Sequence, residues 1–294
     1  MYISTEINSF RDFGENEKVL RMLKDAGFDA YDCSMFYGSN AEREVLDHDD
    51  YLLRAKAFRR VADEIGLVCN QAHAPFPTAI RDGREYMGMS SAEYNRHAHK
   101  KITRAIEAAG ALGAKIIVVH PCNDYTAEQN KELLQSFEGT ARKAGVKIAL
   151  ENMWNCENRT SGFRAAPAAC SHHDDFKAHL SLLPKDVFVA CLDIGHAEMD
   201  GLNTDCVQMI ERLDGDLQAV HIHDNDCVYD RHSLPYTMGI DFAKVLTALK
   251  KIGYRGDVTL EADTYVRKFP LELYPKVAKL MAETAAYMRE ILSK

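Results

Sequence analysis

The 294-residue sequence has no hydrophobic run long enough to cross a membrane, because no segment approaches about 18 consecutive apolar residues. The amino terminus has no basic segment followed by an apolar stretch, so no signal peptide is expected. The chain also lacks an excess of positive charge: its formal net charge is −8. A negative chain has no long-range attraction to a polyanion, which disfavours nucleic acid as a partner.

The sequence also lacks paired cysteine motifs, linkers and low-complexity tracts. Its eight cysteines are scattered without a C-x-x-C, and several fall in apolar runs where cysteine behaves as a small hydrophobe. This pattern is typical of reduced thiols, so a cytoplasmic location is expected. Hydrophobic residues make up 46% of the chain, enough for a sizeable core. We therefore predict a single domain over residues 1–294.

What the sequence does have is a regular alternation of strand and helix signals. The predicted strands are Tyr2–Ile7, Ala30–Ser34, Leu67–His73, Ala114–His120, Val146–Asn152, Val187–Ile194, Leu217–His223 and Asp257–Glu261. The predicted helices are Glu17–Ala26, Tyr51–Ile65, Ser91–Leu112, Ala127–Ala144, Asp174–Leu183, Thr204–Leu213, Asp241–Ile252 and Leu271–Leu292. Glycines at 27, 113 and 253 supply left-handed helix caps.

Eight strands alternating with eight helices predict an α/β fold, a (β/α)8 TIM barrel. The alternative is a doubly wound open sheet. Such a sheet usually carries a glycine-rich phosphate turn after its first strand, and the segment Ile7–Gly14 does not supply one. Longer loops are expected at Pro75–Ser90, Met153–His173 and Asp224–Ile240, each following a strand and therefore on the catalytic face of a barrel.

Metal-ligating side chains stand where four of these strands end. They are Glu151, Asp193, the pair His221 and His223, and Glu261. Carboxylate oxygens and imidazole nitrogens suit Mn²⁺, Mg²⁺, Co²⁺ or Zn²⁺, and the ends of parallel barrel strands converge. We therefore predict a divalent metal site. Because side chains alternate along a strand, His221 and His223 should point the same way, which leaves open which of them is the ligand.

Further strand ends carry Glu6, Asp32, His73 and His120, and His196 follows Asp193 by three residues. His196 has left its strand and can curl back over the site. A single histidine such as His73 is more often a hydrogen-bonded structural residue than a ligand. Trp154, the one tryptophan, sits in the loop after Glu151, where it could wall a sugar's apolar face or simply pack.

Five segments together resemble the xylose-isomerase-like superfamily of barrels. They are Val118-Val-His-Pro, Leu150-Glu-Asn, Leu192-Asp-Ile-Gly-His-Ala, Val220-His-Ile-His-Asp and Leu260-Glu-Ala. The superfamily includes the sugar phosphate isomerase/epimerase family, the ketose 3-epimerases and the AP endonucleases of the endonuclease IV type. The resemblance spans the whole chain, and its motifs are specific to the superfamily but not to a substrate.

The resemblance to ketose 3-epimerases implies one Mn²⁺ or Co²⁺. In this chain its ligands would be Glu151, Asp193, His223 and Glu261, with His196 and Glu157 contacting the sugar. That family also has an arginine a few residues after the strand-7 histidine, and here none precedes Arg231.

The resemblance to the endonuclease-type members implies three Zn²⁺. Nine residues match that pattern: His73, His120, Glu151, Asp193, His196, His221, Asp230, His232 and Glu261. The glycine-rich turn usual after the D-x-H is replaced by Pro235-Tyr-Thr-Met-Gly239. The negative net charge and the acidic segment Asp224–Asp230 would repel a DNA backbone.

The prediction is therefore a metal-dependent isomerase or epimerase of a ketose-like sugar or sugar phosphate. Glu151 and Glu261 would remove and return a proton through a metal-stabilised enediolate, while His196, Glu157, Trp154 and His73 contact substrate. The alternatives are multi-zinc phosphodiester hydrolysis, a lyase or dehydratase using the same metal, and a non-enzymatic sugar-binding barrel. Relatives often form homodimers or homotetramers, so either state is open here.

Overall fold

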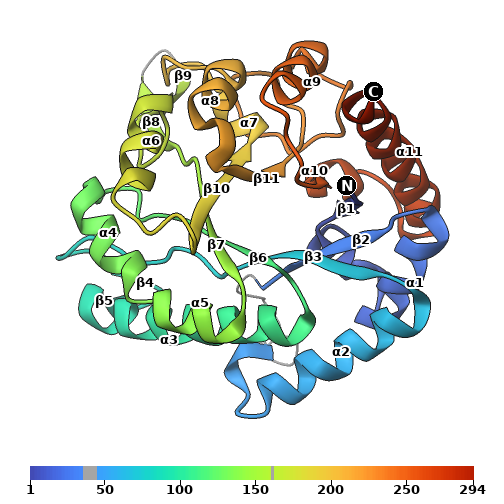
Figure 1. The fold of residues 1–294 in the computed structure, drawn as a ribbon, viewed down its shortest axis with the longest axis horizontal. Helices are drawn as coiled ribbons and strands as arrows, with labels where there is room; N and C mark the ends of the chain where they lie inside the picture. The colour runs from blue at the N-terminus through green and yellow to red at the C-terminus, as the bar shows by residue number, and fades with distance from the viewer. Residues whose placement is uncertain (36–44, 160–161) are drawn as a thin grey trace.

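The computed structural model describes residues 1–35, 45–159 and 162–294, and eight parallel strands in it close into a barrel (Figure 1). The strands are β1 (Ile3–Thr5), β2 (Ala30–Ser34), β3 (Val68–His73), β6 (Ile116–Val119), β7 (Lys147–Glu151), β10 (Phe188–Asp193), β11 (Leu217–His221) and β12 (Val258–Leu260). Six of them pair in the order β11-β10-β7-β6-β3-β2, and β1 pairs with β12.

Two parallel bridges join these groups into one barrel. Glu6 pairs with Asp32 beyond β1, and Ile222 pairs with Leu260 beyond β11. The second bridge is carried by the Ile222 N–H, which donates to the Thr259 carbonyl at 2.9 Å. Closure confirms the predicted TIM barrel and excludes the doubly wound open sheet, which has free edges.

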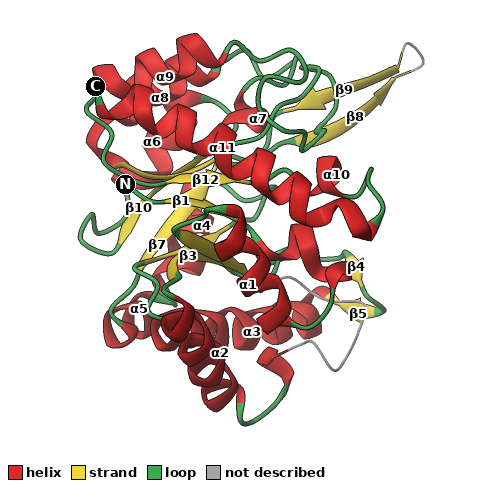
Figure 2. Cartoon of the chain, turned by 90° about the vertical axis from the view of Figure 1, so that its right-hand side faces the viewer, coloured by secondary structure: helices red, strands yellow, loops and turns green. Residues whose placement is uncertain are grey.

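The longer helices form the outer layer around the strands, whereas the short α7 (Ile194–Ala197) and α10 (Asp263–Val266) lie at the strand ends that they follow (Figures 1 and 2). The longer helices are α1 (Asn16–Ala26), α2 (Tyr51–Ile65), α3 (Ser91–Leu112), α4 (Ala127–Gln135), α5 (Glu138–Ala144), α6 (His173–Ser181), α8 (Cys206–Leu213), α9 (Phe242–Lys251) and α11 (Tyr274–Ser293). Short 3-10 turns are η1 (Ile7–Phe13), η3 (Val45–Asp47), η4 (Asp214–Asp216) and η5 (Leu271–Leu273). Within the described ranges, no helix is long and apolar enough to cross a membrane.

The eight predicted strands are confirmed, with ends that differ by a few residues. The prediction of one helix over Ala127–Ala144 is wrong, because the helix breaks at Ser136 and Phe137. Phe137 is fully buried, and its ring stacks on that of His99 at 4.7 Å. At the break the Ser136 hydroxyl donates to the Leu133 carbonyl at 2.5 Å, a side-chain hydrogen bond of the kind that bends helices. All eight cysteines lie in the described part of the chain and are free thiols.

Two of the expected loops contain β-hairpins. The loop after β3 carries β4 (Glu85–Tyr86) and β5 (Met89–Ser90), and the loop after β7 carries β8 (Asn155–Arg159) and β9 (Gly162–Ala166). Figure 2 shows the β8–β9 hairpin extending away from the barrel. Trp154 precedes this hairpin and packs edge-on against Phe163 of β9, with ring centroids 5.7 Å apart. The base of the hairpin is thereby fixed beside the strand ends.

Inside the barrel, Ser4 Oγ and the Asn70 amide donate to Thr259 Oγ1 at 2.9 and 3.2 Å, and the other side is filled by a cluster of small apolar side chains. Val118, Ala149, Val189, Cys191 and Ala219 form this inner cluster. The main hydrophobic core lies between the strands and the helices, as in other barrels of this kind. The side chains predicted to bind metal collect at one end, where the strands finish.

Candidate metal centre and active site

The first group of metal-ligating side chains comes from four strands. Glu151 ends β7, Asp193 ends β10, His221 ends β11 and Glu261 follows β12. One ligand atom from each lies within 4.8 Å of the others. His221 Nδ1 lies 3.1 Å from Glu151 Oε1 and 3.0 Å from Glu261 Oε2. Parallel strands bring their ends together, so the convergence follows from the barrel itself.

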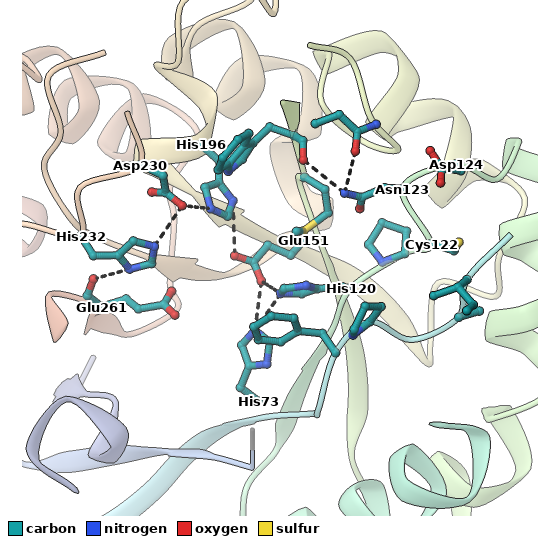
Figure 3. Close-up of a pocket in the computed structure, with 18 of the residues that line it drawn as sticks. His73, His120, Cys122, Asn123, Asp124, Glu151, His196, Asp230, His232 and Glu261 are labelled. Atoms are coloured by element: carbon teal, nitrogen blue, oxygen red, sulfur yellow. Dashed lines mark hydrogen bonds and ion pairs between the residues drawn. The ribbon is translucent and has the colours of Figure 1, made fainter. Parts of the chain in front are cut away.

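The second group lies on the other oxygen of Glu151 (Figure 3). Glu151 Oε2 is 3.2 Å from His73 Nε2 and 3.0 Å from His120 Nε2. The two histidine nitrogens are 3.1 Å apart. The Phe76 ring stacks on His120, with centroids 4.7 Å apart and an interplanar angle of 23°. Glu151 therefore faces one group of ligands with each of its carboxylate oxygens.

The third group is formed by His196, His223, Asp230 and His232. Asp230 Oδ2 lies 3.1 Å from Nε2 of both His196 and His232 (Figure 3). The nearest approach of His223 is its Nε2, 3.0 Å from Asp193 Oδ1. His221 and His223 thus belong to different groups, which the alternation of side chains along β11 does not reveal.

The Asp193-Ile-Gly-His196 motif forms a single helical turn, α7. The Asp193 carboxylate caps this turn by accepting a hydrogen bond from the His196 N–H at 2.7 Å. Capping by aspartate at a helix start is a strong local preference. The turn carries the His196 imidazole back over the strand ends, as the three-residue spacing predicts.

Asn152 holds the ends of β7 and β10 in register. Its side chain donates to the Asp193 carbonyl at 2.9 Å and accepts from the Asp193 N–H at 2.8 Å. The Asn152 carbonyl oxygen lies 2.9 Å from His196 Nδ1. The sequence does not assign this role to Asn152. Its position directly after the strand-end Glu151 is the one feature that points to it.

The loop after β11 is organised around Asp224. Its carboxylate accepts backbone hydrogen bonds from Thr237 at 3.0 Å, Met238 at 2.7 Å and Ile240 at 3.0 Å. Several hydrogen bonds to one buried carboxylate fix a loop firmly. The same loop carries Asp230 and His232, so Asp224 positions these two side chains without being a ligand itself.

The carboxylates of the site are held in their ionised form. Burial opposes ionisation of Glu151, but the imidazoles of His221 and His120 outweigh it and hold the Glu151 pKa well below its usual range. For Asp230, His196 and His232 likewise outweigh burial and lower its pKa. Burial also works against protonation of His196, yet Asp193 and Asp230 raise its pKa to about 10. Ionised carboxylates are what metal ligation requires.

Several buried polar atoms of the site lack a hydrogen-bond partner among the described residues. They include His223 Nδ1, Asp193 Oδ2 and Asp230 Oδ1. Buried polar groups without a partner are rare in proteins and call for a ligand. The donors are all carboxylate oxygens and imidazole nitrogens, the set that Mn²⁺, Co²⁺ and Zn²⁺ accept. These residues therefore fit a divalent metal.

A cavity of about 590 Å³ opens above these groups. Its walls differ in character. One side is apolar and is built from loops after β3, β6 and β7, including Phe76, Ile80, Pro121, Met153 and Trp154. The other side is polar and lies at the junction of the first and last strands, with Glu6, Asn8, Asp263 and Thr264. The cavity has the size and the mixed lining of a small-molecule site.

The predicted substrate contacts are divided between the cavity and the surface. His73, Trp154 and His196 line the cavity, whereas Glu157 lies on the β8–β9 hairpin, is exposed and is not among the lining residues. Phe76, Asn123 and Asp263 also line the cavity, and the sequence does not predict a role for any of them. These three lie in loops, where no periodic pattern marks a residue as facing inward.

Comparison with known proteins places the chain in a family. The profile of the family described as xylose isomerase-like TIM barrel matches residues 20–291. The chain belongs to this family. It is 30% identical over 180 residues to the uncharacterized protein MJ1311 of Methanocaldococcus jannaschii, a match covering 54% of this chain and 55% of that relative. The aligned part thus spans about half of that relative's length.

Solved structures share the fold over the whole chain. The crystal structure of a D-tagatose 3-epimerase-like protein has a TM-score of 0.73 and 21% identity, covering 100% of this chain and 98% of the other. The structure of the IolI protein with a binding zinc atom has a TM-score of 0.68 and 18% identity, with coverage of 100% and 98%. At such identities the likeness establishes the barrel and leaves the chemistry to the site.

Proposed function

We propose that the protein is a divalent-metal-dependent isomerase or epimerase acting on a ketose or ketose phosphate. The observation that carries the proposal is the convergence of Glu151, Asp193, His221 and Glu261 beside a small-molecule cavity that Glu151 and Glu261 line. Solved neighbours described as a 3-epimerase-like protein and as a zinc-bound barrel support it.

The proposed chemistry uses two carboxylates that reach the site from different walls. Glu151 stands on the fifth strand of the barrel and Glu261 on the eighth, and the low pKa of each keeps it ionised and able to accept a proton. One takes the proton from the carbon next to the carbonyl, and the other, after taking up a proton from solvent water, delivers it to the resulting enediolate. A divalent ion, when bound, would polarise the carbonyl as a Lewis acid.

The remaining residues orient the substrate. Burial opposes protonation of His196, but Asp193 and Asp230 raise its pKa to about 10. Its Nε2–H, 3.1 Å from Asp230 Oδ2, would be shared with a substrate oxygen, while Nδ1–H stays on the Asn152 carbonyl. Trp154 lies near it, with ring centroids 6.4 Å apart, and offers an apolar surface to the carbon skeleton. Delivery of a proton to the opposite face of the same carbon gives epimerisation, and delivery to the neighbouring carbon gives aldose–ketose isomerisation.

Proton exchange with solvent is the direct test. The metal-loaded protein is incubated in D₂O with D-fructose, D-tagatose, D-psicose and L-ribulose, and deuterium at the carbons beside the carbonyl is followed by NMR. We expect deuterium incorporation and a new sugar, and a loss of at least about 100-fold in Glu151→Gln and Glu261→Gln. Glu138→Gln on the outer helix α5 is the matched control. The phosphate esters of these sugars are assayed in the same way. If no sugar and no sugar phosphate shows exchange, the proposal is rejected.

A second candidate, multi-metal phosphoester hydrolysis, is favoured by one observation. Glu151 presents its two oxygens to two ligand groups, and a third group with Asp230 lies beside them. A carboxylate placed in this way can bridge two metal ions, as two-metal hydrolases require. Metal content per chain separates the candidates: about one ion supports the isomerase or epimerase, and about three zinc ions with cleavage of abasic-site DNA support hydrolysis.

A further inference from the structure

The carboxyl group of Glu6 faces the same cavity from the barrel wall opposite Glu151. Glu6 follows β1, the first strand, and Glu151 ends β7, the fifth strand in order around the closed barrel. In an eight-stranded barrel these positions are diametrically opposed. Glu6 lines the cavity although the residue as a whole is only 3% exposed. Neither the acid–base pair nor the three ligand groups includes it.

The orientation of the Glu6 side chain is fixed. Ser9 Oγ donates to Glu6 Oε1 at 2.8 Å, and Ser34 Oγ donates to Oε2 at 2.9 Å. The backbone is fixed as well, because the Glu6 N–H donates to the Leu260 carbonyl at 3.1 Å. A buried carboxyl that two serines hold in place, at the edge of a cavity, is arranged as a preorganised binding group rather than as packing.

The surroundings of this carboxyl favour its protonated form. Burial, then Glu261 and Asp263, raise the Glu6 pKa to about 8. A protonated carboxyl can both donate and accept a hydrogen bond, which is what a sugar hydroxyl needs. Asn8 is partly buried, lines the cavity next to Glu6 and offers an amide with the same two capacities.

We propose that Glu6 and Asn8 form the hydroxyl-binding wall of the cavity and determine how a polyhydroxylated substrate is held against Glu151. The inference rests on the proposed function, because it concerns the substrate of the same site. Hydroxyls would face this wall while the carbon skeleton lies toward Trp154 and Phe76 across the cavity. Glu6 is thereby a specificity-determining residue and not a member of the proton-transfer pair.

Xylitol is the probe for this wall, since it has the hydroxyls of a ketose but no carbonyl to react. Binding to the Mn²⁺-loaded protein is measured by calorimetry. We expect Glu6→Ala to weaken xylitol binding about tenfold, because its hydrogen bonds are lost and the buried Ser9 hydroxyl loses its partner. Glu6→Gln should stay within about threefold, because an amide preserves a donor and an acceptor. Asn8→Ala should also weaken binding.

Glu15→Gln is the matched control, an exposed glutamate nine residues further along the chain, and it should leave the affinity unchanged. Metal content and melting temperature show that each variant is folded. For any ketose that is turned over, Glu6→Ala should raise KM more than it lowers kcat. Xylitol that does not bind the parent protein, or that binds Glu6→Ala and Asn8→Ala as tightly as the parent, overturns the inference. If xylitol binding depends on Glu6 but no ketose is turned over, the hydroxyl-binding wall is supported and the proposed reaction is rejected.

Discussion

Gly195 and His223 occupy adjoining space so closely that only a hydrogen fits between them. A Cβ atom at Gly195 would lie 1.9 Å from Cε1 of the buried His223 ring. The glycine of the Asp-Ile-Gly-His motif is therefore required by space and not by backbone conformation. It allows α7 to pass directly over His223, which brings His196 and His223 into one ligand group.

Substitution of this glycine should damage the site and the fold together. Gly195→Ala must push the His223 ring away, and overpacking of a buried position costs about 1–3 kcal/mol of unfolding free energy. We expect lower metal content as well. Gly139→Ala in α5 is the control, since nothing lies within 4 Å of a Cβ there, and it should be neutral or slightly stabilising. Equal stability and metal content in Gly195→Ala and the parent would contradict the crowding argument.

Removal of metal should lower stability as well as activity. Because the ligands come from separate strands, an ion that binds only the folded chain stabilises it by mass action, by about 2.7 kcal/mol at a concentration 100 times its dissociation constant. We expect a chelator to lower the melting temperature and Mn²⁺ or Zn²⁺ to restore it. A melting temperature that a chelator leaves unchanged would argue against metal binding.

The metal content of a His120 variant distinguishes a site for one metal ion from a site for several. His120 contacts Glu151 Oε2, on the side away from His221. For the proposed isomerase or epimerase, His120→Gln should leave the metal content near that of the parent. A loss of about one ion per chain, measured by elemental analysis, would instead favour the hydrolase. The metal content of His120→Gln is compared with that of His97→Gln, a control variant on the outer helix α3.

Glu6 predicts a pH dependence of folding stability with a definite sign. Its pKa is about 8 in the folded protein and 4.5 as the reference value, so the folded state binds more protons between these limits. Stability should therefore fall as pH rises from 4.5 to about 8, with a contribution of at most about 1.4 kcal/mol per pH unit. In metal-free protein, denaturation of Glu6→Gln should show a shallower decline than the parent. Parallel curves would place the Glu6 pKa near its ordinary value.

Arg84 and Asp124 bear on the question of a substrate phosphate. Among the described residues lining the cavity, Arg84 carries the one guanidinium, and it pairs with Asp124 at 2.9 Å. This exposed pair leaves the cation partly neutralised. Asp124→Asn should therefore strengthen binding of D-fructose 6-phosphate by severalfold and leave D-fructose unaffected, as measured by calorimetry. An equal change for both sugars would show that Arg84 does not sense phosphate.

The sequence revealed the barrel because its information is local and repetitive. Apolar strand runs, glycine caps such as Gly27 and Gly113, and helical periodicity each depend on neighbours within a few residues. The sequence does not predict the break between α4 and α5, because the buried Leu134, Phe137 and Ala141 keep the spacing of one helix face across it. The sequence does not predict the two hairpins, because their short strands lie in polar loops without an alternating apolar pattern.

The candidate site divides in the same way. The sequence by itself determined which side chains stand at the strand ends, because strand boundaries are local, and parallel strands then require those ends to meet. Only the tertiary structure decided how these side chains are grouped. His221 lies with Glu151 and Glu261, whereas His223 lies with Asp230. Gly195 leaves space for the His223 ring, and Glu6 lies across the cavity from Glu151. These relations depend on the closure, twist and side-chain packing of the whole barrel, which no segment of the chain encodes alone.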